Sequence, residues 1–171
     1  MTDRESTLLA VRVKRIERVL GHPLPPPRTP PLPLLREEDR NHLREAAEDL
    51  YWNEMAWENL TGEERLDQEF LTEMAFPGFL AFVRGLVLSV TMPDSLAPPR
   101  PSPEIVRDLL GFLAGRVVEL DEQTSQTDCE EREHREAELK MTSRLVDLVL
   151  YILHDIRPDE VEKVEAALAP K

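Results

Sequence analysis

The stretch Phe76–Val90, FPGFLAFVRGLVLSV, decides the fold, and Arg84 is its one charged residue. A helix built from it carries Phe, Leu and Val on every side, and a helix that is apolar all round belongs inside a protein. The stretch is too short to span a bilayer, which takes roughly 17–25 residues. The sequence therefore predicts an all-α fold, a multi-helix bundle around a central apolar helix over residues 76–91.

Length and cysteine content set the class of protein. A chain of 171 residues can bury about 70% of the surface that it exposes when unfolded, so it needs no metal or disulfide for stability. The single cysteine, Cys129, cannot form an internal disulfide, which fits a cytoplasmic location. No signal peptide or transmembrane run is visible. We expect a cytoplasmic protein without a cofactor.

The charge is divided unevenly along the chain. Residues 1–36 hold seven basic and three acidic side chains, a net charge of +4, which leaves −17 for residues 37–171 out of the total of −13. A body this acidic repels nucleic-acid phosphates and anionic lipid. It favours a basic protein partner, although the simpler interpretation is solubility.

The first 22 residues form a basic arm. A helix is predicted over residues 6–20, and Gly21 is suited to end it. Its apolar side chains share one narrow stripe, made of Leu9, Val13, Ile16 and Leu20. Its basic side chains include Arg12, Arg15 and Arg18. A helix this short is marginal alone in water, so the stripe has to dock on the body, on another subunit or on a partner.

Residues 23–35 form a proline-rich linker, PLPPPRTPPLPLL. Locked φ angles over residues 23–33 favour an extended polyproline II rod, which would span roughly 30 Å at about 3.1 Å per residue. Pro23, Pro26 and Arg28 fit a P-x-x-P-x-R ligand pattern, but a stiff spacer explains the prolines as well. With such a linker we expect the arm to cross to a second subunit, giving a homodimer.

Residues 36–171 form the acidic helical body. Helices are predicted over residues 36–60, from the capping box at Thr61, from Pro77, from Pro103 with Ser102 as N-cap, from the capping box at Thr127 to about Ile156, and from Pro158. Gly111 and Gly115 would allow a close approach of another helix. No alternating β-type segment of useful length is present.

An aromatic patch is expected on the helix over residues 36–60. Trp52 and Trp57 are five positions apart, so they cannot both face the same core. If Trp57 is inward, Tyr51, Trp52 and Met55 form a partly exposed patch, and aromatic residues of this kind are enriched at protein interfaces. Packing of this patch beneath the arm is the alternative.

A metal site is the second functional possibility. Helical bundles that bind two metal ions use Glu-x-x-His pairs, and Glu131 and His134 have that spacing. Glu54 interrupts an apolar stripe and could face them. A second Glu-x-x-His pair is absent from the sequence, and a solvated charged helix end is the simpler interpretation.

Two functions are therefore carried forward. The first is a non-enzymatic protein–protein interaction or assembly protein, in which an acidic body and a tethered basic helix meet on another subunit or partner. Its interaction residues would be those of the arm together with Tyr51 and Trp52. The alternative is a carboxylate-bridged metal enzyme with Glu131, His134 and Glu54 as ligands.

Overall fold

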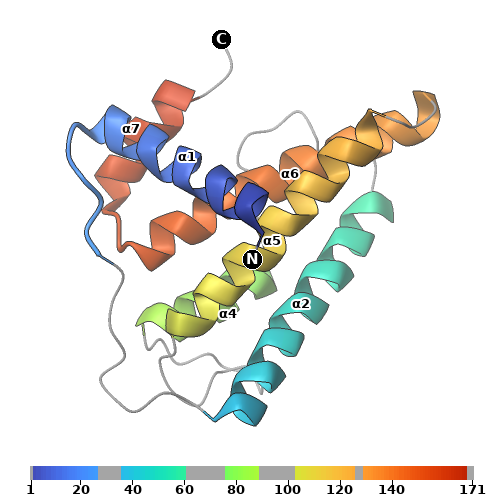
Figure 1. The fold of residues 1–171 in the computed structure, drawn as a ribbon, viewed down its shortest axis with the longest axis horizontal. Coiled ribbons are helices and arrows are strands. Elements are labelled where there is room, and N and C mark those ends of the chain that lie inside the picture. Colours follow the sequence, from blue (N-terminus) through green and yellow to red (C-terminus); the bar gives the residue numbers. More distant parts are fainter. Residues whose placement is uncertain (1, 27–35, 61–75, 89–102, 126–128, 169–171) are drawn as a thin grey trace.

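The computed structural model describes residues 2–26, 36–60, 76–88, 103–125 and 129–168, and within these ranges it is all-helical, as predicted. The helices, shown in Figure 1, are α1 (Asp3–Leu20), α2 (Glu37–Leu60), α4 (Pro77–Leu88), α5 (Pro103–Thr124), α6 (Cys129–Leu153) and α7 (Pro158–Leu168). Several predictions concern segments outside the described residues. They are most of the proline-rich linker, the helix after Thr61, the last residues of the 76–91 helix, and the caps at Ser102 and Thr127.

The helix boundaries follow local sequence signals. Pro77, Pro103 and Pro158 each open a helix, as predicted, because the first helical position needs no backbone N–H. Gly21 ends α1 with φ of 79°, and its N–H donates to the carbonyl of Glu17 at 2.8 Å. The start of α1 lies at Asp3, earlier than expected, because Thr2 and a glutamate three residues later form a capping box.

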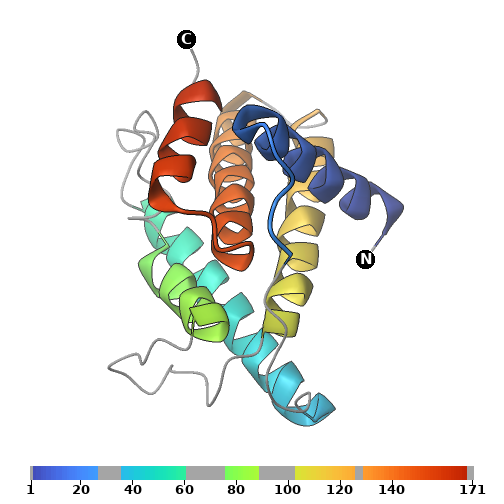
Figure 2. The same cartoon turned by 90° about the vertical axis from the view of Figure 1, so that its left-hand side faces the viewer.

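The helices pack around an antiparallel pair, α5 and α6, which makes the most extensive contact between any two described helices. Helix α2 runs alongside α5, and α4 packs against α2, α5 and α6 (Figure 1). Helix α1 lies across α5 and also contacts α7, as the turned view in Figure 2 shows. The apolar helix α4 therefore contacts three other helices, but the pair α5 and α6 lies at the centre of the described bundle, where the sequence predicts the 76–91 helix.

The core confirms the predicted burial of α4. Phe79, Val83 and Leu86 are fully buried and Phe82 is 1% exposed. Burying side chains of this size contributes about 1.5–3 kcal/mol each. The same core cluster contains side chains of α5 and α6, which include Ile105, Leu109, Leu113, Leu145, Val146 and Val149.

The predicted aromatic patch is wrong for two of its three residues. Tyr51 is fully buried and Met55 is 2% exposed, whereas Trp52 is 45% exposed. The Tyr51 ring stacks on Phe76 with centroids 5.7 Å apart. Its hydroxyl forms a 2.8 Å hydrogen bond with the hydroxyl of Thr142 on α6, which satisfies both buried groups. Tyr51 therefore belongs to the core, because α4 and α6 close over that face of α2.

Candidate interaction site

The apolar stripe of α1 is covered by the chain's own body. Ile16 is fully buried and Leu20 is 9% exposed, while Leu9 and Val13 are half-buried and pack against the core. Within one chain α1 lies on α5, α6 and α7, and the crossing of the arm to a second subunit stays a prediction. The stripe is available to a partner only after α1 leaves this position.

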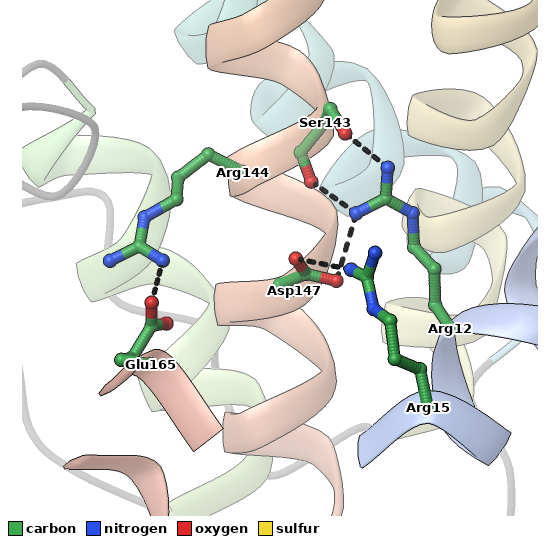
Figure 3. Close-up of polar contacts among 6 residues, drawn as sticks. All are labelled: Arg12, Arg15, Ser143, Arg144, Asp147 and Glu165. Atoms are coloured by element: carbon green, nitrogen blue, oxygen red, sulfur yellow. Dashed lines mark hydrogen bonds and ion pairs between the residues drawn. The ribbon is translucent and has the colours of Figure 1, made fainter. Parts of the chain in front are cut away.

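A polar cluster made of Arg12, Arg15, Ser143 and Asp147 joins α1 to α6 (Figure 3). Nη1 of Arg12 donates to Oδ1 of Asp147 at 2.9 Å and to the backbone carbonyl of Ser143 at 3.0 Å. Nη2 of Arg12 also donates to the Ser143 hydroxyl. Arg15 adds a longer contact to Oδ2 of Asp147, at 3.4 Å. We call this group the Asp147 cluster.

The Asp147 cluster places one carboxylate between two guanidinium groups. Asp147 is 6% exposed, so its charge has lost most of its water. A carboxylate buried in this way is tolerated only when it is paired and hydrogen-bonded. The side chain of Arg12 is 15% exposed and that of Arg15 is 42% exposed, so Arg12 supplies the better shielded interaction. Arg12 and Asp147 therefore form the shielded ion pair between α1 and α6.

Sequence reasoning identified Arg12 and Arg15 but missed Asp147. The sequence alone assigns no role to the acidic residue in the second half of α6. The missed signal is the single acidic residue between Leu145 and Leu153, because an acid within an apolar half-helix needs a cationic partner from elsewhere. Arg18, the third predicted arginine, is exposed and takes no part in the Asp147 cluster.

Helix α1 comes close to the backbone of α5 at Gly115. A Cβ atom at this position would lie 3.1 Å from Oε1 of Glu5, tighter than an ordinary contact. This contact involves the side chain of Glu5 and no backbone atom of α1, so the close helix approach expected at Gly111 and Gly115 stays a prediction. Arg4 pairs with Glu122 of α5 at the same end of α1, but both side chains are more than half exposed, so this pair adds little stability.

A second polar contact joins α6 to α7 beside the Asp147 cluster. Arg144 donates to Glu165, as drawn in Figure 3. The ring of Tyr151 is buried in the same region. Burial, reinforced by the carboxylates of Glu165 and Asp147, raises the pKa of Tyr151 above its ordinary value. The Tyr151 hydroxyl therefore stays neutral, and the charges beside it are those of the Arg144–Glu165 pair and of Asp147.

A groove of about 670 Å³ runs beside α1, between α1, α5 and α6. Its apolar lining consists of Leu8, Val11, Val117, Val118 and Leu139. Arg4, Arg12 and Arg15 stand on its α1 side. Val11 is 58% exposed, and together with Trp52 it makes up the large hydrophobic side chains that the described part of the chain exposes.

Trp52 is held in a fixed setting on α2. The guanidinium carbon of Arg116 lies 4.8 Å from the centre of its ring, within the range of a cation–π interaction. Arg116 is itself 9% exposed and pairs with Glu119 at 2.9 Å and with Glu138 at 3.5 Å. The ring also meets Phe112 edge-on, with centroids 6.3 Å apart. The indole is thus half exposed, and its covered part contacts Arg116 and Phe112.

The three candidate metal ligands are not brought together. Among the residues that the structure describes, no three His, Cys, Asp or Glu side chains gather as metal ligands. His134 is exposed and lies 3.8 Å from Glu138 on its own helix, while Glu131 is exposed. Glu54 instead accepts a hydrogen bond from the backbone N–H of Phe79 at the start of α4. The interruption that Glu54 makes in its stripe is a helix cap.

The chain matches no family model, no curated protein and no solved structure. None of the described helices combines the length and apolar character needed to cross a membrane.

Proposed function

We propose that this chain is a non-enzymatic helical interaction and assembly protein. Its acidic body receives a basic amphipathic helix, and α1 occupies that position within its own chain. The observation that carries the proposal is the meeting of Arg12 and Arg15 with the buried carboxylate of Asp147. Apolar contacts beneath Ile16 and Leu20 supply affinity, and the carboxylate selects a cationic helix.

The partner in this proposal is a protein, and a second copy of the chain is the simplest one. Each copy carries both the basic helix and the acidic body, whose net charges are of opposite sign. A cytoplasmic location belongs to the same proposal, and the single cysteine supports it. The metal-enzyme alternative is not carried further, because Glu54, Glu131 and His134 do not form a ligand set.

The test uses a labelled peptide of residues 1–22 and full-length protein. In the wild-type chain α1 competes at an effective concentration in about the millimolar range, so the added peptide should not bind measurably. In the variant Arg12→Ala/Ile16→Ala the chain's own α1 is weakened while the docking surface is unchanged, so the peptide should bind. Fluorescence anisotropy measures both.

The matched control adds Asp147→Asn to the weakened variant. Peptide binding should then be lost, because the carboxylate that selects the arginines is gone. If the peptide fails to bind the chain whose α1 is weakened, the body is not a docking site for a basic helix and the proposed function is wrong.

A further inference from the structure

The two large hydrophobic side chains that the described residues expose lie on oppositely charged helices. Val11 belongs to the outward face of α1, and Trp52 belongs to α2. Single exposed hydrophobic side chains are common on protein surfaces. The residues that surround Val11 and Trp52 therefore decide whether either side chain marks an interaction surface.

Val11 stands at one end of a row of cations. Lys14, Arg15 and Arg18 follow it at i+3, i+4 and i+7, the spacing that places side chains on one face of a helix. Lys14 and Arg18 are exposed, and neither is used by the Asp147 cluster. This face of α1 is therefore basic with one apolar end.

Trp52 stands at one end of a row of acids with the same spacing. Glu45, Glu48 and Asp49 precede it at i−7, i−4 and i−3. Glu45 and Asp49 are exposed and Glu48 is half-buried. Burial, opposed by Arg44 and reinforced by the neighbouring acids, raises the pKa of Glu48, so a further cation nearby would relieve an unfavourable setting.

The two rows are complementary when the helices run antiparallel. In one register Val11 meets Trp52, Lys14 meets Asp49, Arg15 meets Glu48 and Arg18 meets Glu45. Every charged position then faces a charge of the opposite sign, and the apolar position faces the apolar position. The groove beside Val11 has room for the exposed part of the indole, which Arg116 already holds in place.

We propose that α1 of one copy of this chain packs antiparallel against α2 of a second copy in this register. The inference rests on the proposed function and names its partner. It leaves each α1 on its own body, with the 2.9 Å contact between Arg12 and Asp147 intact, while Arg15 gives up its longer 3.4 Å contact with Asp147 to meet Glu48. Exchange of α1 between copies would only replace contacts by identical ones, whereas this pairing covers side chains that one copy leaves exposed.

The test is a charge exchange followed by sedimentation equilibrium. The variant Lys14→Glu/Arg18→Glu and the variant Glu45→Lys/Asp49→Lys should each self-associate less tightly than the wild type, by about tenfold per reversed pair. An equimolar mixture of the two variants should associate like the wild type, because every contact between unlike variants pairs opposite charges again. Trp52→Ala should weaken association by roughly thirtyfold or more, as expected for a buried aromatic anchor.

Matched controls carry the same change in net charge away from both rows. They are Arg132→Glu/Lys163→Glu on α6 and α7, and Glu133→Lys/Glu162→Lys on the same helices, all at exposed positions. These controls should associate like the wild type. The register is tested with single variants. A mixture of Lys14→Glu and Asp49→Lys, which face each other in the proposed register, should recover more association than a mixture of Lys14→Glu and Glu45→Lys, which do not.

Two results would overturn the inference. One is a wild-type chain that stays monomeric at all concentrations. The other is association that the charge reversals leave unchanged, which would place the subunit contact elsewhere. In both cases the peptide of residues 1–22 can still bind the chain with a weakened α1, because Asp147 takes no part in the proposed pairing. Failure of this inference is therefore distinguishable from failure of the proposed function.

Discussion

The carboxylate of Glu54 on α2 accepts a 2.9 Å hydrogen bond from the backbone N–H of Phe79 and so caps the start of α4 from another helix. Gly78 makes this approach possible, since a Cβ atom there would lie 2.5 Å from Oε1 of Glu54. An acid at the N-terminus of a helix also meets the positive end of its dipole.

Replacing Glu54 by alanine should lower the free energy of unfolding by about 0.5–2 kcal/mol, the usual cost of a lost N-terminal cap. Gly78→Ala should also destabilise, because its methyl group displaces the carboxylate. Urea denaturation measures both. Asn53→Ala, at an exposed position of the same helix, is the control and should change stability little. Equal effects of Glu54→Ala and Asn53→Ala would show that the cap has no energetic role.

Leu86 tests the enclosure of α4. The side chain is fully buried, so Leu86→Ala should leave a cavity and cost about 2–5 kcal/mol. Denaturant unfolding followed by far-UV circular dichroism gives the value, with exposed Arg107→Ala as the control. A loss below about 1 kcal/mol would mean that this face of α4 is open to solvent in solution.

Local signals in the sequence predicted where the helices begin and end, but they did not predict which helices pack against one another. Proline and glycine act on the residues beside them, so Pro77, Pro103, Pro158 and Gly21 mark boundaries without any tertiary information. The role of Glu54 depends on a helix start 25 positions further along the chain, which no local pattern reports. An acid that interrupts an apolar stripe therefore resembled a possible metal ligand.

Two neighbouring residues on α2 also show that a local sequence pattern does not report contacts between helices. Tyr51 and Trp52 are about 100° apart around the helix, and either could face the core. Their environments are set by α4, α5 and α6, which close over Tyr51 and leave Trp52 half exposed. The candidate site was found only in part for a similar reason. The arginines of α1 form a visible basic row, whereas Asp147 becomes meaningful only when α1 is placed on α6.

The hydrogen bond between Tyr51 and Thr142 predicts a coupled pair. Tyr51→Phe should cost about 1–2 kcal/mol, because it leaves the buried Thr142 hydroxyl without this partner. Thr142→Val should cost a similar amount, and the double variant should cost less than the sum of the two. A double-mutant cycle measures the interaction energy. Strictly additive losses would contradict the pairing.

The tyrosines predict a loss of stability in alkali. The chain has two tyrosines, both are buried, and burial is the main cause that raises the pKa of Tyr51 and of Tyr151. Below about pH 10 both residues are neutral in the folded and unfolded states, so the stability is fully present. Above this pH the unfolded chain ionises first, and stability should fall by about 1.4 kcal/mol per pH unit for each tyrosine.

Tyrosinate absorbance should therefore rise together with unfolding and not before it. Tyr151→Phe should make stability fall less steeply above pH 10, and comparison with the wild type removes the contribution of lysine. Tyrosinate absorbance that rises at the ordinary pKa while the helical signal persists would show that the rings are accessible to water.

Asp147 governs the attachment of α1, so its removal should act on one helix first. Asp147→Asn keeps the shape but takes away the charge that faces Arg12, and breaking a shielded pair from one side costs about 3 kcal/mol. Amide hydrogens of α1 should then exchange roughly a hundredfold faster, while those of α5 and α6 change less. Hydrogen exchange read by mass spectrometry resolves the helices, with Glu162→Gln on α7 as the control. Equal acceleration in α1, α5 and α6 would mean that α1 opens only with the whole fold, and the cluster would then be part of the core and not a docking contact.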